Sequence, residues 1–163
     1  VMAILHMVKC PEVGGDTMWA NMYAAYEALS DRMQRLLSEL RAWNDGGGFR
    51  AIASERGKQE LDADVRSVHP VVRTHPVTGR RGLFVNSSFT KEIDGMKPAE
   101  SKALLRFLFD HIDQPEFACC FRWRDHSIAM WDNRCTQHRV VRDNLHDLRH
   151  MERVTIVGDG PPQ

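Results

Sequence analysis

The chain has 163 residues, and its 22 lysines and arginines balance 22 aspartates and glutamates. This length fits one domain with a sizeable core, so residues 1–163 are expected to form a single domain. The balanced charge argues against nucleic acid or an anionic membrane as a partner, and no apolar stretch is long enough to span a bilayer.

Residues 1–8 are apolar enough to form a buried strand. Pro11 and the pair Gly14-Gly15 should then turn the chain and present Asp16 and Thr17. The glycine pair lacks the lysine of a phosphate-binding loop, so a plain turn is the better interpretation.

Two helices are expected next, over residues 20–29 and 31–43, with Ser30 as the N-cap of the second. The second segment carries apolar residues at the i, i+3, i+4, i+7 spacing of one buried face. These residues are Met33, Leu36, Leu37 and Leu40.

Residues 44–68 are polar and charged with little periodicity, and they contain the run Gly46-Gly47-Gly48 near their start, which is typical of a loop. Short strands joined by a turn at 77–80 follow over residues 69–86. His69 and His75 each precede a proline and could form a metal pair. A structural role is favoured, because histidines are often partly buried without a metal.

Pro98 marks the first turn of a helix that should run to about Ile112 and bury Leu104, Leu105, Leu108 and Ile112. Beyond Pro115, an alternating strand should place Phe117, Cys119, Phe121 and Trp123 on one face. Arg122 and Arg124 then lie on the other face, where a solvated position is the usual outcome. Residues 127–131 form a further short strand.

The segment from Trp131 to His138, with Arg149 and Arg153 downstream, carries the chemistry. His138 offers a neutral imidazole that can hold a divalent metal. In an extended chain Arg149 and Arg153 point to the same face, together with Met151, Thr155 and Val157. Two interior arginines are costly unless each meets an anion, so this outline predicts an active site.

The segments WDNRCTQHRVV and LRHMERVTIVGD resemble the C-terminal signature of the taurine dioxygenase family, the Fe(II)- and 2-oxoglutarate-dependent oxygenases. GGDTMWANMYAAYEALS, HPVVRTHPVTGRRGLFVN and FLFDHIDQPEF also resemble that family, in its order along the chain. Together with the strand pattern, the resemblance implies an α+β fold with a distorted double-stranded β-helix (jelly roll) and a helical insertion.

The resemblance assigns roles by position. His138 matches the distal histidine of a triad of two histidines and one carboxylate around iron, which leaves open positions for 2-oxoglutarate and O2. Arg149 and Thr17 match the residues that hold the far carboxylate of 2-oxoglutarate, and Arg153 matches the substrate anchor. Phe49 and Phe89 are expected near the substrate, with loop or core packing as their alternatives. The resemblance also implies that residues at about 44–68 form a variable, lid-like segment near the substrate entrance.

One departure concerns the other two iron ligands, a His-x-Asp pair that the family carries before the GGDT segment. Nothing precedes Val1, so a partial chain is expected, and the alternative is a protein that has lost iron. The sequence His111-Ile112-Asp113 ends a helix where the family has no ligand, and a plain helix-end histidine is the better interpretation. The pair His150 and Glu152 is expected on the face opposite the two arginines.

The expected activity is hydroxylation of a small anionic substrate such as taurine or another sulfonate, with Fe(II), 2-oxoglutarate and O2. An alkyl sulfate or aryloxyalkanoate is the alternative substrate, because an arginine binds each of these anions. The rival from another class is a non-catalytic jelly-roll binding protein. A homo-oligomer is also expected.

The cysteines Cys10, Cys119, Cys120 and Cys135 show no C-x-x-C spacing and are expected to be reduced packing residues. Reduced cysteines favour a cytoplasmic protein. Cys135 lies three positions before His138, and we hypothesise that it is prone to oxidation.

Overall fold

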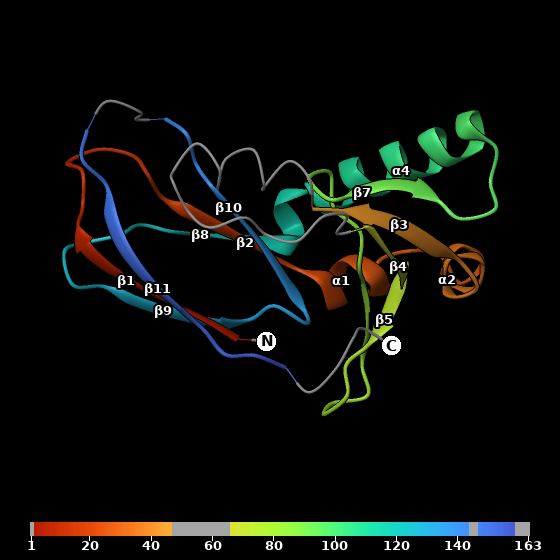
Figure 1. Cartoon of the computed structure of the whole chain (residues 1–163), viewed down its shortest axis with the longest axis horizontal. Coiled ribbons are helices and arrows are strands. Elements are labelled where there is room, and N and C mark those ends of the chain that lie inside the picture. Colours follow the sequence, from red (N-terminus) through yellow and green to blue (C-terminus); the bar gives the residue numbers. More distant parts are fainter. Residues whose placement is uncertain (1, 47–65, 144–146, 159–163) are drawn as a thin grey trace.

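The computed structural model describes residues 2–46, 66–143 and 147–158. Two antiparallel three-stranded sheets face each other in this part of the chain (Figure 1). The first has the order β11-β1-β9, with β1 at Met2–Lys9, β9 at Ile128–Asp132 and β11 at His150–Thr155. The second has the order β10-β2-β8, with β2 at Thr17–Asn21, β8 at Ala118–Phe121 and β10 at Thr136–Val140.

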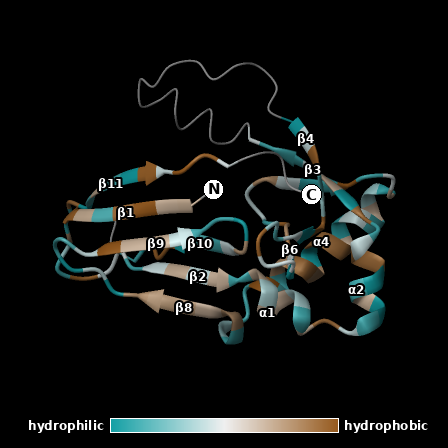
Figure 2. Cartoon of the chain, turned by 90° about the horizontal axis from the view of Figure 1, so that it is seen from below, coloured by the Kyte–Doolittle hydropathy of each residue, from teal (hydrophilic) through white to brown (hydrophobic). Residues whose placement is uncertain are grey.

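The helices gather at the end of the molecule away from these two sheets (Figure 2). They are α1 at Met22–Glu27, α2 at Asp31–Ser38 and α4 at Pro98–Ile112. A third sheet, β4-β3-β7, lies with them and consists of β3 at Arg41–Asp45, β4 at Arg66–Pro70 and β7 at Thr90–Ile93. A hairpin of β5 (Val72–Thr74) and β6 (Arg81–Leu83) and a 3-10 turn at Pro115–Phe117 complete this region.

Local sequence signals explain where the helices begin. The Asn21 side chain accepts hydrogen bonds from the backbone N–H groups of Tyr23 and Ala24, which caps α1. Ser30 caps α2 in the same way, as the sequence predicted. Pro98 opens α4, and the Glu100 side chain accepts from the Lys97 backbone N–H, so the predicted bounds of this helix are confirmed.

The main apolar core lies among the helices and the third sheet. Leu105 and Leu108 of α4 are buried there, and the backbone N–H of Ile93 donates to the buried Ser101 hydroxyl, which ties α4 to β7. Leu104 is only partly buried, so the predicted apolar face of α4 is confirmed with that one difference.

Three predicted elements were wrong in their bounds. The second helix ends at Ser38 rather than at 43, because residues 41–45 form β3, which pairs with both β4 and β7. Leu36 is consequently 45% exposed, and only Leu37 of the predicted buried stripe is fully buried. Residues 20 and 21 belong to β2, and the strand expected over 117–124 is confined to β8.

The lid-like segment predicted at about residues 44–68 overlaps a strand at each end and otherwise stays a prediction. Residues 44 and 45 complete β3, and residues 66–68 begin β4. The rest of that segment, residues 47–65, lies outside the described residues. No described helix is long and apolar enough to cross a membrane.

Candidate active site

His138 lies in β10, opposite Trp19 of β2, on the face that looks toward the first sheet. Its imidazole centroid is 4.8 Å from the ring of Trp131, which comes from β9 of that facing sheet. The residue as a whole is exposed, yet loss of hydration lowers the pKa of His138 below 6.5, and the positive charge of Arg153 lowers it further. The ring is therefore neutral at pH 7, which is the form that binds a metal.

Three tryptophans connect the two sheets around this histidine. The Trp19 ring lies 5.2 Å from Trp131 and 6.3 Å from Trp123, measured between centroids. Trp123 also donates its indole N–H to the hydroxyl of Thr17 at 2.9 Å, and Thr17 is fully buried. Thr17 is thus held in one orientation inside the sheet pair.

Arg149 lies just before β11 and reaches the same interior. Its Nε donates to the carbonyl oxygen of Gly15 at 2.9 Å, and its Nη2 donates to the hydroxyl of Thr17 at 3.4 Å. Burial lowers the pKa of the Arg149 guanidinium, and no carboxylate pairs with it among the residues described. A partly buried cation without a counter-charge is suited to binding an anion.

Gly15 makes room for this arginine. Its φ is +72°, a conformation that side chains disfavour, and a Cβ atom there would lie 3.0 Å from Arg149 Cδ. The backbone N–H of Gly15 donates to Asp143 at 2.8 Å, which fixes the turn further. The predicted turn at Gly14-Gly15 is confirmed, but no local pattern predicted that Arg149 would contact it.

Arg153 lies in β11 opposite Leu5 of β1. The register places Met151 and Thr155 on the same face, opposite Met7 and Ala3, both of which are fully buried. The prediction that Met151, Arg153 and Thr155 point to the same face is therefore confirmed within β11. Arg153 projects toward the side of the sheet that faces His138. The Arg153 residue itself is exposed.

Of the two aromatic candidates, only Phe89 belongs to the described part of the chain. Phe89 precedes β7, where its backbone N–H donates to Asn86 Oδ1 at 2.8 Å and its carbonyl accepts from the Asp45 N–H. It therefore belongs to the third sheet rather than to the two sheets that carry His138 and the arginines. Phe49 lies outside the described residues.

The histidines that the sequence argument set aside make other contacts. His111 Nε2 contacts the Ala25 carbonyl oxygen at 2.7 Å, and its ring lies 5.1 Å from Phe117, so it is a half-buried packing residue. Asp113 pairs with Arg139 at 3.3 Å. Glu152 pairs with His6 on the outer face of the first sheet, 3.2 Å from its ring nitrogen.

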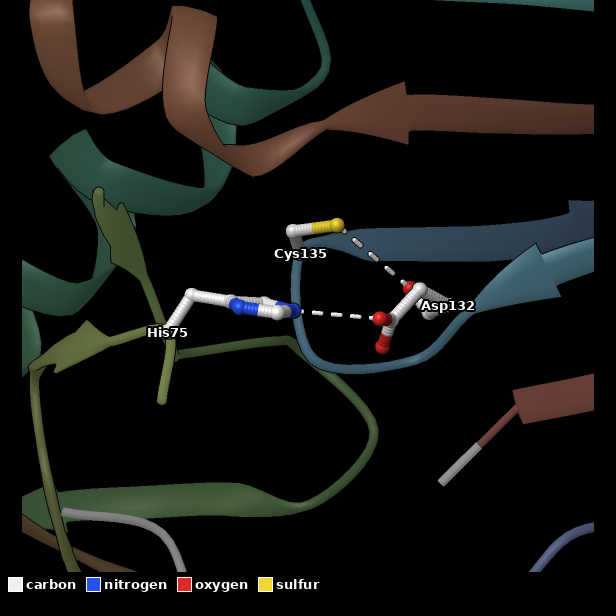
Figure 3. A group of neighbouring side chains, drawn as sticks. All are labelled: His75, Asp132 and Cys135. Atoms are coloured by element: carbon white, nitrogen blue, oxygen red, sulfur yellow. Dashed lines mark hydrogen bonds and ion pairs between the residues drawn. The ribbon is translucent and has the colours of Figure 1, made fainter. Parts of the chain in front are cut away.

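Of the two hairpin histidines, His69 contacts the Ser67 hydroxyl at 2.7 Å. His75 is 4% exposed and lies beside Asp132 and Cys135, in a group whose ligand atoms are within 4.8 Å of one another (Figure 3). Within the described ranges this is the one group of three such side chains close enough for a metal, and it does not include His138. The contact between His75 and Asp132 was not predicted from the sequence.

All four cysteines are free thiols, but Cys119 and Cys120 are exposed, so the prediction that all four are packing residues was wrong for these two. Burial raises the pKa of the Cys135 thiol, because it disfavours the thiolate. This shift argues against the hypothesis that Cys135 is prone to oxidation, since the thiolate is the reactive form.

The side chains on the inner face provide part of what an iron site with a dianionic cosubstrate requires. His138 provides one neutral imidazole, and Arg149 with Thr17 provides a cationic cradle for a carboxylate. The indole N–H of Trp19 is buried without a hydrogen-bond partner in the described part of the chain, so this interior retains an unmet donor. Among the described residues on this inner face, only the His138 side chain is placed to serve as an iron ligand.

Comparison with protein families matches residues 2–155 to the model of the taurine catabolism dioxygenase TauD, TfdA family. The chain is 36% identical to an alpha-ketoglutarate-dependent sulfate ester dioxygenase of Pseudomonas putida, over 98% of this chain and 56% of that protein. It is 33% identical to an alpha-ketoglutarate-dependent sulfonate dioxygenase of Saccharomyces cerevisiae, over 95% and 38% respectively. A 2,4-dichlorophenoxyacetate dioxygenase of Cupriavidus pinatubonensis is 34% identical, over 96% and 55%.

Solved structures show the same fold. A taurine dioxygenase from Burkholderia xenovorans superposes with a TM-score of 0.84 at 39% identity, over 99% of this chain and 53% of that one. AAD-2 in complex with Mn(II) and N-oxalylglycine gives a TM-score of 0.84 at 34% identity, over 98% and 64%. The predicted jelly-roll fold is confirmed. The chain spans about half the length of the curated relatives that it matches.

Proposed function

The chain belongs to the taurine catabolism dioxygenase TauD, TfdA family. From that premise we propose that it is part of an Fe(II)- and 2-oxoglutarate-dependent dioxygenase. The proposed reaction converts 2-oxoglutarate, O2 and a substrate C–H group into succinate, CO2 and the hydroxylated substrate. The observation that carries the proposal is that His138, Arg149 and Arg153 lie on the facing sides of the two sheets, with Arg149 partly buried between them.

His138 is proposed as one of three iron ligands. Its ring is neutral at pH 7 and packs against Trp131. A metal can therefore bind to the ring without first displacing a proton from an imidazolium. The family resemblance implies a His-x-Asp pair as the other two ligands. Iron, when bound with 2-oxoglutarate, supplies the activation of O2 and the oxidation of the substrate.

Arg149 and Thr17 are proposed to hold the far carboxylate of 2-oxoglutarate. The Thr17 hydroxyl accepts from Trp123, so its own proton is free to donate to a carboxylate. The Arg149 fork keeps donors beyond the one directed at Gly15, and its partly buried charge lacks a described counter-ion. A carboxylate at this place would satisfy both groups.

Arg153 is proposed to anchor an anionic group of the substrate, on the side of His138. Taurine or another sulfonate is our first candidate substrate, and an alkyl sulfate or an aryloxyalkanoate is the alternative, because relatives named for each are similarly close. If the hydroxylated carbon bears a sulfonate, the product would collapse to an aldehyde and sulfite. The family resemblance implies that Phe89 and Phe49 contact the substrate, and this stays a prediction, because Phe89 lies beside the third sheet and Phe49 lies outside the described residues.

The direct test is succinate formation by the protein with its complete coding sequence, in the presence of Fe(II), 2-oxoglutarate and candidate sulfonates. We expect His138→Ala to lower this rate by more than about 100-fold. Loss of a residue that only hydrogen-bonds to a metal ligand already lowers metal affinity or activity by about 10- to 100-fold. His150→Ala is the matched control, since His150 is an exposed histidine in β11 outside the site. Unchanged succinate formation in the His138 variant would end the proposal.

The rival is a binding protein that uses the two arginines to hold a small dianion without iron. It predicts metal-independent binding of 2-oxoglutarate and no succinate. Reading the gene upstream of Val1 also separates the two functions, because only the dioxygenase requires a His-x-Asp pair there. A homo-oligomeric state and a cytoplasmic location stay predictions, to be checked by light scattering and by fractionation.

A further inference from the structure

We propose that His75 is a positioning residue for His138, acting through Asp132 and the turn that connects β9 to β10. The proposal rests on the proposed role of His138 as a metal ligand. Asp132 ends β9, and β10 begins at Thr136, two residues before His138. The turn between them thus decides where the ligand strand starts.

The Asp132 carboxylate is the centre of this turn. Arg134 contacts it through its backbone N–H at 2.8 Å to Oδ1 and through Nη2 at 2.6 Å to Oδ2. These bonds come from the same turn and fold it locally. His75 is different, since its Nε2 lies 3.1 Å from Asp132 Oδ2 and it comes from the end of β5, 57 residues earlier (Figure 3).

The other ring nitrogen of His75 decides the direction of that bond. Nδ1 accepts from the backbone N–H groups of Val77 and Thr78, each at 3.2 Å, so it cannot carry a proton itself. The ring proton is therefore on Nε2, which donates to Asp132. This arrangement also argues against a metal bound by His75, Asp132 and Cys135, because neither ring nitrogen keeps a free lone pair.

The turn transmits this anchor to the ligand strand. The Thr136 hydroxyl donates to the Asp132 carbonyl oxygen at 2.6 Å, and the Cys135 carbonyl accepts from the Met22 N–H at 3.0 Å. Beyond these contacts β10 pairs with β2, with His138 opposite Trp19. The start of β10 is thus held by two contacts, one with Asp132 and one with Met22.

The same turn also supports the imidazole ring directly. Asn133 accepts from the indole N–H of Trp131 at 2.9 Å, and Trp131 is the ring against which His138 packs. A displaced turn would therefore move both the backbone that carries His138 and the surface behind its ring. Metal ligands lose affinity when the groups that orient them are lost.

The test uses His75→Leu, which removes both ring nitrogens at similar volume, in the protein with its complete coding sequence. Mn(II), a redox-inert probe, is titrated with N-oxalylglycine present, and unbound Mn(II) is followed by electron paramagnetic resonance. We expect the Kd for Mn(II) to rise about 3- to 10-fold. This is less than the change expected when a residue hydrogen-bonded directly to a metal ligand is lost. His75→Gln, whose amide N–H can still donate to Asp132, should recover most of the affinity.

His69→Leu is the matched control, because His69 lies one strand earlier and bonds only Ser67 among the described residues. Its Kd should stay within twofold of wild type. Asp132→Asn is the second variant if His75→Leu folds poorly, and its Kd should rise in the same direction. Turnover at saturating Fe(II) should return to near the wild-type value for the His75 variants, whereas a merely structural defect would lower it at every metal concentration.

A Kd within twofold of wild type in folded His75→Leu would overturn the inference. Loss of a second Mn(II) equivalent in that variant would also overturn it, because His75 would then be a ligand itself. A wild-type protein that binds no Mn(II) would instead contradict the proposed function, and this inference with it. The three outcomes are distinguishable in one titration series.

Discussion

The helical region and the pair of facing sheets differ in how they use their side chains. The helices and the third sheet enclose a continuous apolar core, which includes Leu37, Val71, Val85 and Leu108, each fully buried. In the facing sheets, apolar residues such as Ile128, Met130 and Val154 are more than 60% exposed, while buried Thr17 and half-buried Arg149 are polar. Stability and ligand binding are therefore expected to respond to different substitutions.

The largest effect on stability is expected from Leu108→Ala in α4. Leu108 is fully buried, and such truncations cost about 2–5 kcal/mol in the free energy of unfolding. The neighbouring Phe107→Ala is the control, because Phe107 is 45% exposed and should cost less than about 1.5 kcal/mol. Urea unfolding measures both. If Leu108→Ala also weakened 2-oxoglutarate binding in the folded protein, the two regions would not be separable.

The next largest effect is expected from Arg149→Ala. Loss of one charge-assisted contact should weaken 2-oxoglutarate binding by about 1.5–3 kcal/mol, roughly 10- to 100-fold in Kd. The free energy of unfolding should change little, since the lost cation has no described counter-charge. Titration calorimetry with N-oxalylglycine measures the change, and Arg142→Ala at an exposed position serves as the control. If Arg149→Ala weakened binding of the substrate as much as binding of 2-oxoglutarate, the proposed division of roles between Arg149 and Arg153 would be wrong.

Gly15→Ala is expected to link the two properties. A side chain at φ +72° costs about 1–2 kcal/mol in unfolding free energy, and its Cβ would also press on Arg149. Gly79→Ala is the matched control, since Gly79 has a φ of +69° with nothing within 4 Å. Both variants should lose stability in thermal unfolding, but only Gly15→Ala should raise the Kd for 2-oxoglutarate. Equal Kd values would show that Arg149 tolerates the crowding.

The smallest effect is expected from Arg153→Ala, because this arginine is exposed and its attraction for an anion is screened by water. A loss of about 1 kcal/mol, roughly fivefold in KM for the substrate, should leave the KM for 2-oxoglutarate unchanged. Steady-state kinetics with a sulfonate, an alkyl sulfate and an aryloxyalkanoate measures this loss. Arg122→Ala on the exposed strand end is the control.

The sequence predicted the elements that depend on local patterns. The bounds of α4, the Ser30 cap and the shared face of Met151, Arg153 and Thr155 follow from spacing and from residue type alone. The end of α2 did not follow, because Leu40 continues the helical spacing although residues 41–45 pair with two other strands. There the pairing of distant strands overrode a local helical pattern.

By itself, then, the sequence determined the periodicity of the elements and the types of residue that could hold a metal or an anion. Only the tertiary structure decided which of these residues meet. Arg149 lies against Gly15, and Asp132 lies against His75, across 134 and 57 positions of the chain. Spacing within one element fixes the direction of a side chain, but contacts between distant segments depend on how the sheets and the hairpin pack together.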